Sequence, residues 1–198
     1  MAPDAADFLV KIDFAKLGAG EKKMRCYIRL PREDEKKIME TVYIAGGCLW
    51  GVQHFFDKVP GVLSTEAGRA NGTTNTLDSS YDGYAECVKV TFDEKVTTVS
   101  KLMGHLFEII DPYSQNKQGV DVGKKYRTGI YSTSARHLDE AKAFIEKRED
   151  RNKIVVEVLP LTNYVRSAEE HQHHLERYPE DCSFCHIPDK VLNKYRDN

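Results

Sequence analysis

Two hydrophobic periods alternate along the chain from residue 41 onward. Segment 84–92, YAECVKVTF, has a period of two, which is typical of a half-buried strand and places Glu86, Val88 and Phe92 on one face. Segment 99–110 has a period near 3.6, which is typical of an amphipathic helix.

These periods predict a series of elements. Strands are expected over 41–45, 84–92, 126–132 and 153–159, and helices over 48–59, 99–110, 134–148 and, shorter and polar, 167–178. Strands and helices that intermix along one chain indicate an α/β or α+β sandwich. Two loops between them, 68–83 and 111–125, are long enough to carry function.

The first 40 residues follow a different pattern. A short apolar piece at 8–14 and a possible strand at 24–30 are separated by a glycine break, and the charged run PREDEKK follows. We therefore divide the chain into an N-terminal extension, 1–40, to which the sequence assigns no role, and a domain over 41–198 with a less regular C-terminal tail. The extension is either a small strand-bearing appendage or partly mobile.

Composition narrows the class of protein. Of 198 residues, 40% are hydrophobic and 30% are charged, which suits one globular core and excludes wholesale disorder. The 29 lysines and arginines are balanced by 31 acidic residues, so no nucleic-acid partner is expected. No run approaches the ~20 apolar residues of a membrane helix. The first residues include acidic side chains, where a signal peptide would have basic ones. We expect a cytoplasmic protein with no membrane partner.

Five cysteines, an odd number, indicate reactive or buried thiols rather than a disulfide framework. Cys48 is the most informative, because it follows a strand and two glycines and begins a helix. Backbone N–H groups and the positive end of the helix dipole then face its sulfur and favour the thiolate. The alternative is a small buried cysteine at a strand–helix junction. Trp50 nearby would either wall an apolar pocket or anchor the core.

Glu86 is the second candidate for chemistry. Its carboxyl group shares a strand face with apolar side chains, and that face is expected to be buried. Desolvation disfavours the charged form and raises a carboxyl pKa, so Glu86 is a candidate general acid. The alternative is a glutamate near the strand end that reaches water or pairs with a lysine.

The tail motif Cys182-Ser-Phe-Cys185-His186 allows three interpretations. It matches the attachment motif of a c-type haem, which requires export. The two cysteines and the histidines upstream could bind zinc. The third interpretation is a thiol that attacks an oxidised Cys48 and converts it to a disulfide.

Segment 118–131 carries weaker signals. Asp121 and Tyr126 stand among glycines just before a predicted strand. The Tyr126 hydroxyl could meet an oxygen of a ligand, or else Asp121 caps a turn and Tyr126 packs.

Five motifs together resemble the A-type peptide methionine sulfoxide reductases, in the order of that family: GGCLWG at 46–51, YAE at 84–86, QGVDVGKKYRT at 118–128, AEEHQHHL at 168–175 and FCHI at 184–187. The resemblance spans about residues 42–187. It implies a ferredoxin-like two-layer sandwich core of mixed sheet with helices. It also implies reduction of the S-epimer of methionine sulfoxide, protein-bound or free, by a monomer that uses thioredoxin as reductant and needs neither cofactor nor metal.

The same resemblance assigns roles to residues. It makes Cys48 the nucleophile, Glu86 the proton donor and Cys185 the thiol that resolves a sulfenic acid on Cys48. Asp121 and Tyr126 would then shape the site of the sulfoxide oxygen.

The resemblance also predicts which residues receive the S-methyl group of the substrate, and the chain differs from the usual family sequence at a few positions. Trp50 and Leu49 would receive the S-methyl group, with Leu49 standing at the family's usual phenylalanine. Tyr84 stands at the usual histidine, and Tyr81 is expected to supply the second oxygen-binding hydroxyl. Cys182 is an additional tail thiol and an alternative resolving residue.

Two rival functions remain open from the sequence. One is a non-catalytic zinc-binding or interaction module organised by the His/Cys tail. The other is a thiol enzyme that reduces peroxides, for which the acid at Glu86 would have no evident use.

Overall fold

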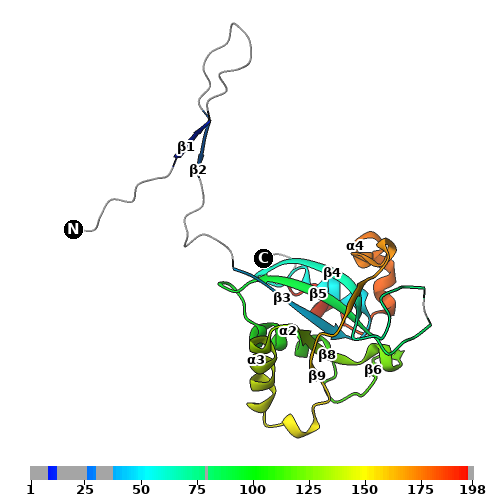
Figure 1. Cartoon of the computed structure of the whole chain (residues 1–198). Coiled ribbons are helices and arrows are strands. Elements are labelled where there is room, and N and C mark those ends of the chain that lie inside the picture. Colours follow the sequence, from blue (N-terminus) through cyan, green and yellow to red (C-terminus); the bar gives the residue numbers. More distant parts are fainter. Residues whose placement is uncertain (1–8, 13–25, 30–37, 79, 196–198) are drawn as a thin grey trace. The chain divides into compact units, whose positions relative to one another are not determined.

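A computed structural model describes residues 9–12, 26–29, 38–78 and 80–195 (Figure 1). The chain divides into two compact units, 1–37 and 38–198. In the first unit, β1 (Leu9–Ile12) and β2 (Cys26–Arg29) pair in antiparallel fashion. The strand expected over 24–30 is thus present at Cys26–Arg29, and the rest of that segment lies outside the described residues. In the part of the chain described, no helix is long and apolar enough to cross a membrane.

The second unit is built on a six-stranded sheet. Its strands are β3 (Met39–Gly46), β4 (Val62–Ala70), β5 (Ala85–Asp93), β8 (Thr128–Ser132), β9 (Glu157–Pro160) and β10 (Tyr164–Arg166). Its helices are α1 (Leu49–Phe56), α2 (Val99–Ile109), α3 (Ala135–Glu146), α4 (His174–Arg177) and α5 (Asp189–Leu192). A short hairpin of β6 (Lys117–Gln118) and β7 (Asp121–Val122) lies between α2 and β8.

The strand order is β10-β4-β5-β3-β8-β9. Within it, the succession β3-α1-β4-β5-α2-β8 forms a βαββαβ unit whose strands lie in the ferredoxin-like order β4-β5-β3-β8. β9 extends this sheet parallel to β8, and β10 extends it antiparallel to β4. The expected ferredoxin-like core of mixed sheet with helices is therefore confirmed.

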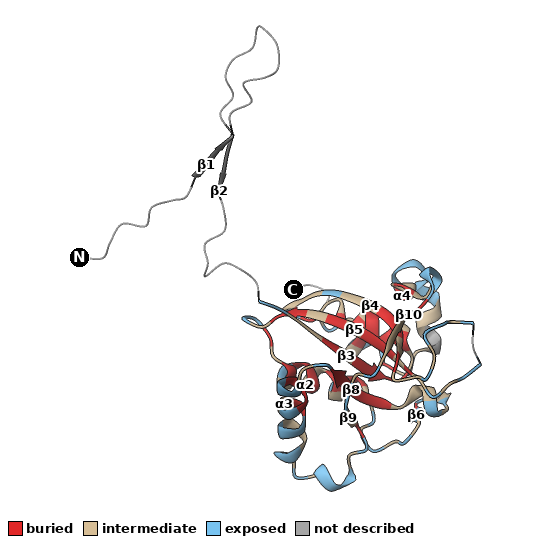
Figure 2. Cartoon of the chain, viewed as in Figure 1, coloured by how far each residue is buried: buried red, intermediate tan, exposed pale blue. Residues whose placement is uncertain are grey.

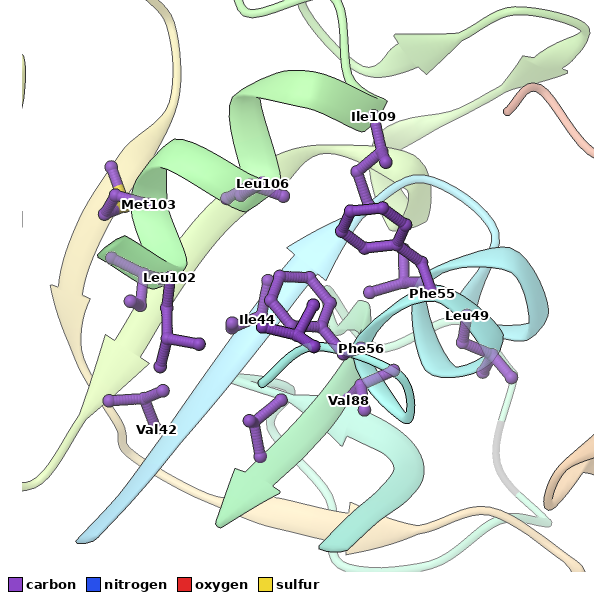
Figure 3. Close-up of a cluster of buried hydrophobic side chains, with 14 of the residues drawn as sticks. Val42, Ile44, Leu49, Phe55, Phe56, Val88, Leu102, Met103, Leu106 and Ile109 are labelled. Carbon is purple, nitrogen blue, oxygen red and sulfur yellow. The ribbon is translucent and has the colours of Figure 1, made fainter. Parts of the chain in front are cut away.

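The main core lies between the sheet and the helices α1 and α2 (Figures 2 and 3). Alternation along β3 sends Val42 and Ile44 to this face, where they meet Phe55 and Phe56 of α1. All four side chains are fully buried. Each such side chain contributes roughly 1.5–3 kcal/mol of transfer free energy, which makes this layer the main source of stability.

The opposite face of the sheet carries a smaller cluster. Ala45, Cys87 and Tyr131 are buried there, with Tyr43 and Tyr164 packed against them. The alternation of β5 therefore places Cys87 on this face and Glu86 on the helix-facing side, as the sequence pattern predicts.

Several elements differ from the expectation. The helix expected over 167–178 is divided into a 3-10 turn at Glu169–His171 and the short α4. The loop expected over 68–83 begins only after β4, which the sequence did not predict. The reason is that β4 has a glycine where Tyr164 packs: a Cβ on Gly68 would lie 2.3 Å from the Tyr164 ring, so the missing side chain makes room for this ring. β8 starts at Thr128 because a 3-10 turn occupies Lys124–Tyr126, and β9 starts at Glu157, after a similar turn at Arg151–Lys153.

Candidate active site

Cys48 lies at the N-cap of α1, at the junction between β3 and α1. Gly47 makes this junction possible, because its φ is +92° and a Cβ there would lie 2.7 Å from Cε1 of His186. Only glycine combines that backbone conformation with so close an approach. The turn places the Cys48 sulfur at the first turn of α1, where the Trp50 N–H donates a hydrogen bond to it.

Glu86 lies one residue into β5 and points to the same end of α1. Its Oε2 accepts a hydrogen bond from the Leu49 N–H at 3.3 Å. Its Oε1 lies 2.9 Å from Nζ of Lys125. The Glu86 side chain thus accepts from an N–H group at the helix start and pairs with a cation.

A cavity of about 320 Å³ opens at this point. It is lined by Cys48, Leu49, Trp50, Gly51, Arg69, Tyr84, Glu86, Asp121, Lys125, Tyr126, Ser167, His171, Leu175, Asp181 and Cys185. The structure therefore brings together seven residues named from the sequence: Cys48, Leu49, Trp50, Glu86, Asp121, Tyr126 and Cys185. They come from α1, β5, the β6–β7 hairpin with the turn after it, and the C-terminal tail.

Trp50 is held in place by two tail histidines. The ring of His174 stacks on the indole with centroids 3.6 Å apart and an interplanar angle of 12°. The indole Nε1 donates a hydrogen bond to Nδ1 of His171 at 3.2 Å. In turn, Nε2 of His174 lies 2.7 Å from Oδ2 of Asp181. These contacts fix the indole as one wall of the cavity.

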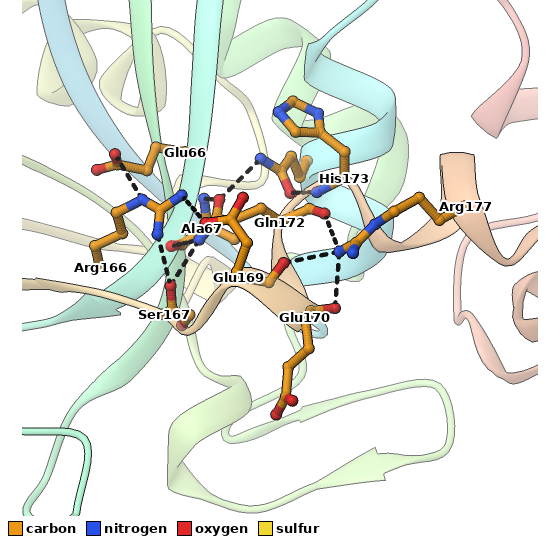
Figure 4. A network of polar contacts seen from close by, with 10 residues as sticks. Glu66, Ala67, Arg166, Ser167, Glu169, Glu170, Gln172, His173 and Arg177 are labelled. Carbon is orange, nitrogen blue, oxygen red and sulfur yellow. Dashed lines mark hydrogen bonds and ion pairs between the residues drawn. The ribbon is translucent and has the colours of Figure 1, made fainter.

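Gln172 fastens the tail segment to the sheet (Figure 4). Its buried Oε1 accepts a hydrogen bond from the Ala67 N–H, and its Nε2 donates to the carbonyl groups of Ala67 and Ser167, each at 2.9 Å. The His173 N–H donates to Oε1 of Gln53 on α1 at 2.8 Å. Because β4 and α1 both hold this segment, His171 and His174 meet Trp50 in a fixed orientation.

Cys185 packs directly on α1. A Cβ added to Gly51 would lie 2.3 Å from the Cys185 sulfur, so this sulfur occupies the space that the glycine leaves. Gly51 stands three residues after Cys48, on the same face of the helix. Burial raises the pKa of the Cys185 thiol to about 11.

His186 anchors the tail next to Cys185. Its side chain is 3% exposed, and its Nδ1 lies 3.6 Å from Oδ2 of Asp121. A Cβ on Gly119 would lie 2.6 Å from the Cβ of His186, so the hairpin approaches this residue closely. Burial lowers the pKa of His186 and raises that of Asp121.

Two residues named from the sequence lie elsewhere. Cys182 is outside the cavity lining, and its thiol donates to Oδ1 of Asp189 at 3.4 Å. Tyr81 is also outside the lining, and its side chain is 46% exposed and packs edge-on against Tyr84. The second tyrosine that lines the cavity is Tyr84, because it directly precedes β5, whereas Tyr81 belongs to the loop before it.

The protonation state of Cys48 differs from the expectation. Burial and then the nearby Glu86 carboxylate raise the pKa of its thiol to about 12, against the opposing hydrogen bond from Trp50. The sequence predicted a thiolate favoured by the helix dipole. The structure shows that the first N–H of α1, from Leu49, points to Glu86 instead of the sulfur. The resting form at neutral pH is therefore the thiol.

Sequence reasoning assigned no role in the cavity to six of its lining side chains: Arg69, Lys125, Ser167, His171, Leu175 and Asp181. The guanidinium group of Arg69 stacks on the Tyr84 ring at 4.5 Å. Lys125 belongs to the motif at 118–128, but a pair of lysines in a loop is ordinarily solvated, so the sequence predicts no role for it. The sequence does place these two lysines directly before Tyr126, a predicted site residue, and this was the signal that could have indicated Lys125.

The zinc interpretation of the tail does not match the arrangement of its ligands. His171 and His174 contact Trp50, while Nδ1 of His173 lies 2.9 Å from Oδ2 of Asp57. Within residues 38–78 and 80–195, the group of metal-type ligands that gathers closely is Asp57, His173 and Glu176. Neither tail cysteine belongs to it.

Comparison with known proteins identifies relatives of the chain. The family model for peptide methionine sulfoxide reductase (PMSR) matches residues 40–197. Peptide methionine sulfoxide reductase MsrA of Clostridium acetobutylicum is 38% identical over 169 residues, which cover 79% of this chain and all of that protein. Mxr1 of Saccharomyces cerevisiae in reduced form has a TM-score of 0.67 and 29% identity, over 72% of this chain and 87% of its own. Mxr1 in complex with Trx2 matches with a TM-score of 0.50 and 24% identity, over 69% and 84% of the two chains.

Proposed function

Because the chain belongs to the peptide methionine sulfoxide reductase family, we propose that it reduces the S-epimer of methionine sulfoxide, protein-bound or free, to methionine. The observation that carries this proposal is the one cavity shared by Cys48, Glu86, Tyr126 and Trp50. A methyl sulfoxide has the complementary parts: an electrophilic sulfur, a basic oxygen and an apolar methyl group. Its reduction makes the protein an oxidoreductase that repairs oxidative damage.

The lining suggests how the sulfoxide binds. The S-methyl group would lie against the indole of Trp50 and the side chain of Leu49, where sulfur–aromatic contact is favourable. The oxygen would face Glu86 and Tyr126. Burial raises the pKa of Tyr126, so its hydroxyl stays protonated and can donate a hydrogen bond. Separate places for the methyl group and the oxygen give the site a handedness, which supports selection of one epimer.

The first chemical step needs an anionic sulfur and a proton on the sulfoxide oxygen. The Cys48 thiol carries the one proton that this step requires. In our proposal this proton leaves Cys48 and reaches the sulfoxide oxygen through Glu86 while the sulfur attacks. The oxygen is transferred to Cys48, so the products are methionine and a sulfenic acid on Cys48.

The second step regenerates the thiols. Cys185 attacks the sulfenic acid, which releases water and forms a disulfide with Cys48. Its position against Gly51, in the same cavity, favours it over Cys182 as the resolving residue. We further propose thioredoxin as the reductant of this disulfide, which the complex of yeast Mxr1 with Trx2 supports.

The remaining assignments follow from this chemistry. The cavity lining lies within residues 41–198, so we propose that segment as the reductase domain, in a protein that acts as a monomer. A disulfide that thioredoxin must reduce suits a reducing compartment, and we propose the cytoplasm.

The test uses the separate S and R enantiomers of a methyl aryl sulfoxide with dithiothreitol as reductant. We expect the wild-type protein to consume the S form and Cys48→Ala to consume neither. Cys87→Ala is the matched control, because Cys87 is buried on the opposite face of the sheet. Turnover by Cys48→Ala at the wild-type rate would overturn the proposal, and so would consumption of hydrogen peroxide in preference to sulfoxide.

A further inference from the structure

Lys125 is a cation inside the candidate active site. It belongs to the 3-10 turn Lys124–Tyr126 and lines the cavity. Its Nζ lies 2.9 Å from Oε1 of Glu86 and 4.6 Å from the centre of the Tyr126 ring. The side chain is 37% exposed, so the ammonium reaches the carboxylate from the side that opens to solvent.

Other charged and titratable groups line the same cavity as Glu86. They are Cys48 at the start of α1, Arg69 on β4, Tyr84 before β5, Asp121 on β7, Tyr126 beside Lys125, and His171, Asp181 and Cys185 in the tail. Of the described cations in this lining, Arg69 stacks on Tyr84 and donates to the Leu77 carbonyl group at 3.2 Å. Lys125 is the one whose charged group contacts the Glu86 carboxylate.

We propose that Lys125 is a positioning residue that holds Glu86 as a carboxylate before the sulfoxide enters, so that the acid proton is supplied by the Cys48 thiol. This inference rests on the proposed function. In the step itself the S–H bond of Cys48 breaks, the proton passes to Glu86 and then to the sulfoxide oxygen, and that oxygen ends on the Cys48 sulfur. No proton is gained from or lost to solvent.

The role of the Lys125 ammonium is clearest when the Cys48–Glu86 pair is considered without it. If Glu86 took its proton from solvent while Cys48 kept its own, the pair would hold two protons and the nucleophile would be lost. A positive charge at hydrogen-bonding distance disfavours that state. Burial lowers the pKa of Lys125, but its hydrogen bonds to Tyr126 and Glu86 raise it by more, so the ammonium remains charged across the working range.

The experiment measures single-turnover reduction of the S sulfoxide against pH in Lys125→Gln, Lys125→Arg and Lys124→Gln. Lys124→Gln is the matched control, because Lys124 is the preceding residue of the same turn and is exposed. We expect the acidic limb of the profile to move up by about one pH unit or more in Lys125→Gln. It should stay in place in Lys125→Arg, which keeps the charge, and in Lys124→Gln. An equal loss of rate at every pH in Lys125→Gln, without a shift, would indicate a merely structural role and overturn the proposal.

A second readout is independent of the sulfoxide. Alkylation of Cys48 by iodoacetamide, followed by peptide mass spectrometry, reports the proton held by the Cys48–Glu86 pair. The pH profile of Cys48 alkylation should move to higher pH in Lys125→Gln, which lacks the cation, and should not move in Lys125→Arg or Lys124→Gln. If the wild-type protein reduces no sulfoxide, the proposed function fails, and the alkylation profile still decides whether Lys125 sets the charge of the pair. An unmoved alkylation profile in Lys125→Gln would overturn the inference.

Discussion

Gly51→Ala is expected to separate the two chemical steps of the proposed reaction. The new Cβ would lie 2.3 Å from the Cys185 sulfur and 3.0 Å from Cδ1 of Ile187. Ordinary van der Waals contact begins near 3.4 Å, so the Cys185 sulfur must move by about 1 Å. A displacement of that size at a reacting atom costs about 10²-fold in rate. Overpacking of this kind also costs roughly 1–3 kcal/mol of stability.

The affected step is disulfide formation between Cys48 and Cys185. The protein is mixed with one equivalent of S sulfoxide in the absence of reductant, quenched with an alkylating agent at successive times and analysed by mass spectrometry. We expect methionine to form at nearly the wild-type rate, while the sulfenic acid on Cys48 accumulates and the disulfide appears about 10²-fold more slowly.

Gly104→Ala provides the matched control for this experiment. Gly104 lies within α2, and a Cβ there meets nothing within 4 Å. This variant should gain the helix propensity of alanine, up to about 1 kcal/mol, with both chemical steps unchanged. Disulfide formation at the wild-type rate in Gly51→Ala, with no sulfenic acid detected, would refute the placement of Cys185 against α1.

Further predictions concern single groups of the site. Glu86→Gln should lower the single-turnover rate by roughly 10²–10⁴-fold with sulfoxide affinity retained, and an unchanged rate would contradict its role as acid. Because burial raises the pKa of the Cys48 thiol to about 12, the protonated form predominates at pH 8. Alkylation of Cys48 should then rise tenfold per pH unit above pH 8, and a plateau below pH 9 would show an ordinary thiol. His186→Asn removes the ring that faces Asp121 and should slow disulfide formation on the order of tenfold, which corresponds to about 1.4 kcal/mol. A slower first step with normal disulfide formation would argue against this anchoring role.

Regular patterns along the chain were sufficient to predict the elements that carry the chemistry. The alternation at 84–92 placed Glu86 on the helix-facing side of β5, and the two glycines before Cys48 predicted the turn into α1. Both features are local, because a strand period and a glycine at positive φ follow from a few neighbouring residues.

Features that depend on contacts between distant segments were missed. β4 has small residues where the Tyr164 ring packs, so its sequence lacks the large alternating side chains that identify a strand. Lys125 resembles any exposed loop lysine until the fold brings it to Glu86, 39 positions earlier in the chain. The helix start suggested a thiolate at Cys48, and only the structure shows that Glu86 takes the first N–H group.

Which tail cysteine faces the cavity also depends on contacts between distant segments. Cys182 and Cys185 are equivalent by sequence spacing, and the 3-10 turn over Pro179–Phe184 gives them different surroundings. The turn leaves Cys182 beside Asp189 and directs Cys185 onto Gly51.

The central claim is that Cys48 attacks the sulfoxide and Cys185 resolves the product within one cavity. The most direct measurement adds one equivalent of each sulfoxide epimer to the reduced protein and maps the disulfide by peptide mass spectrometry. The S epimer should yield a single disulfide between Cys48 and Cys185 together with one equivalent of methionine, and the R epimer should leave all thiols free. Methionine formed without oxidation of Cys48, or a disulfide that joins Cys48 to Cys182 instead, would contradict the account.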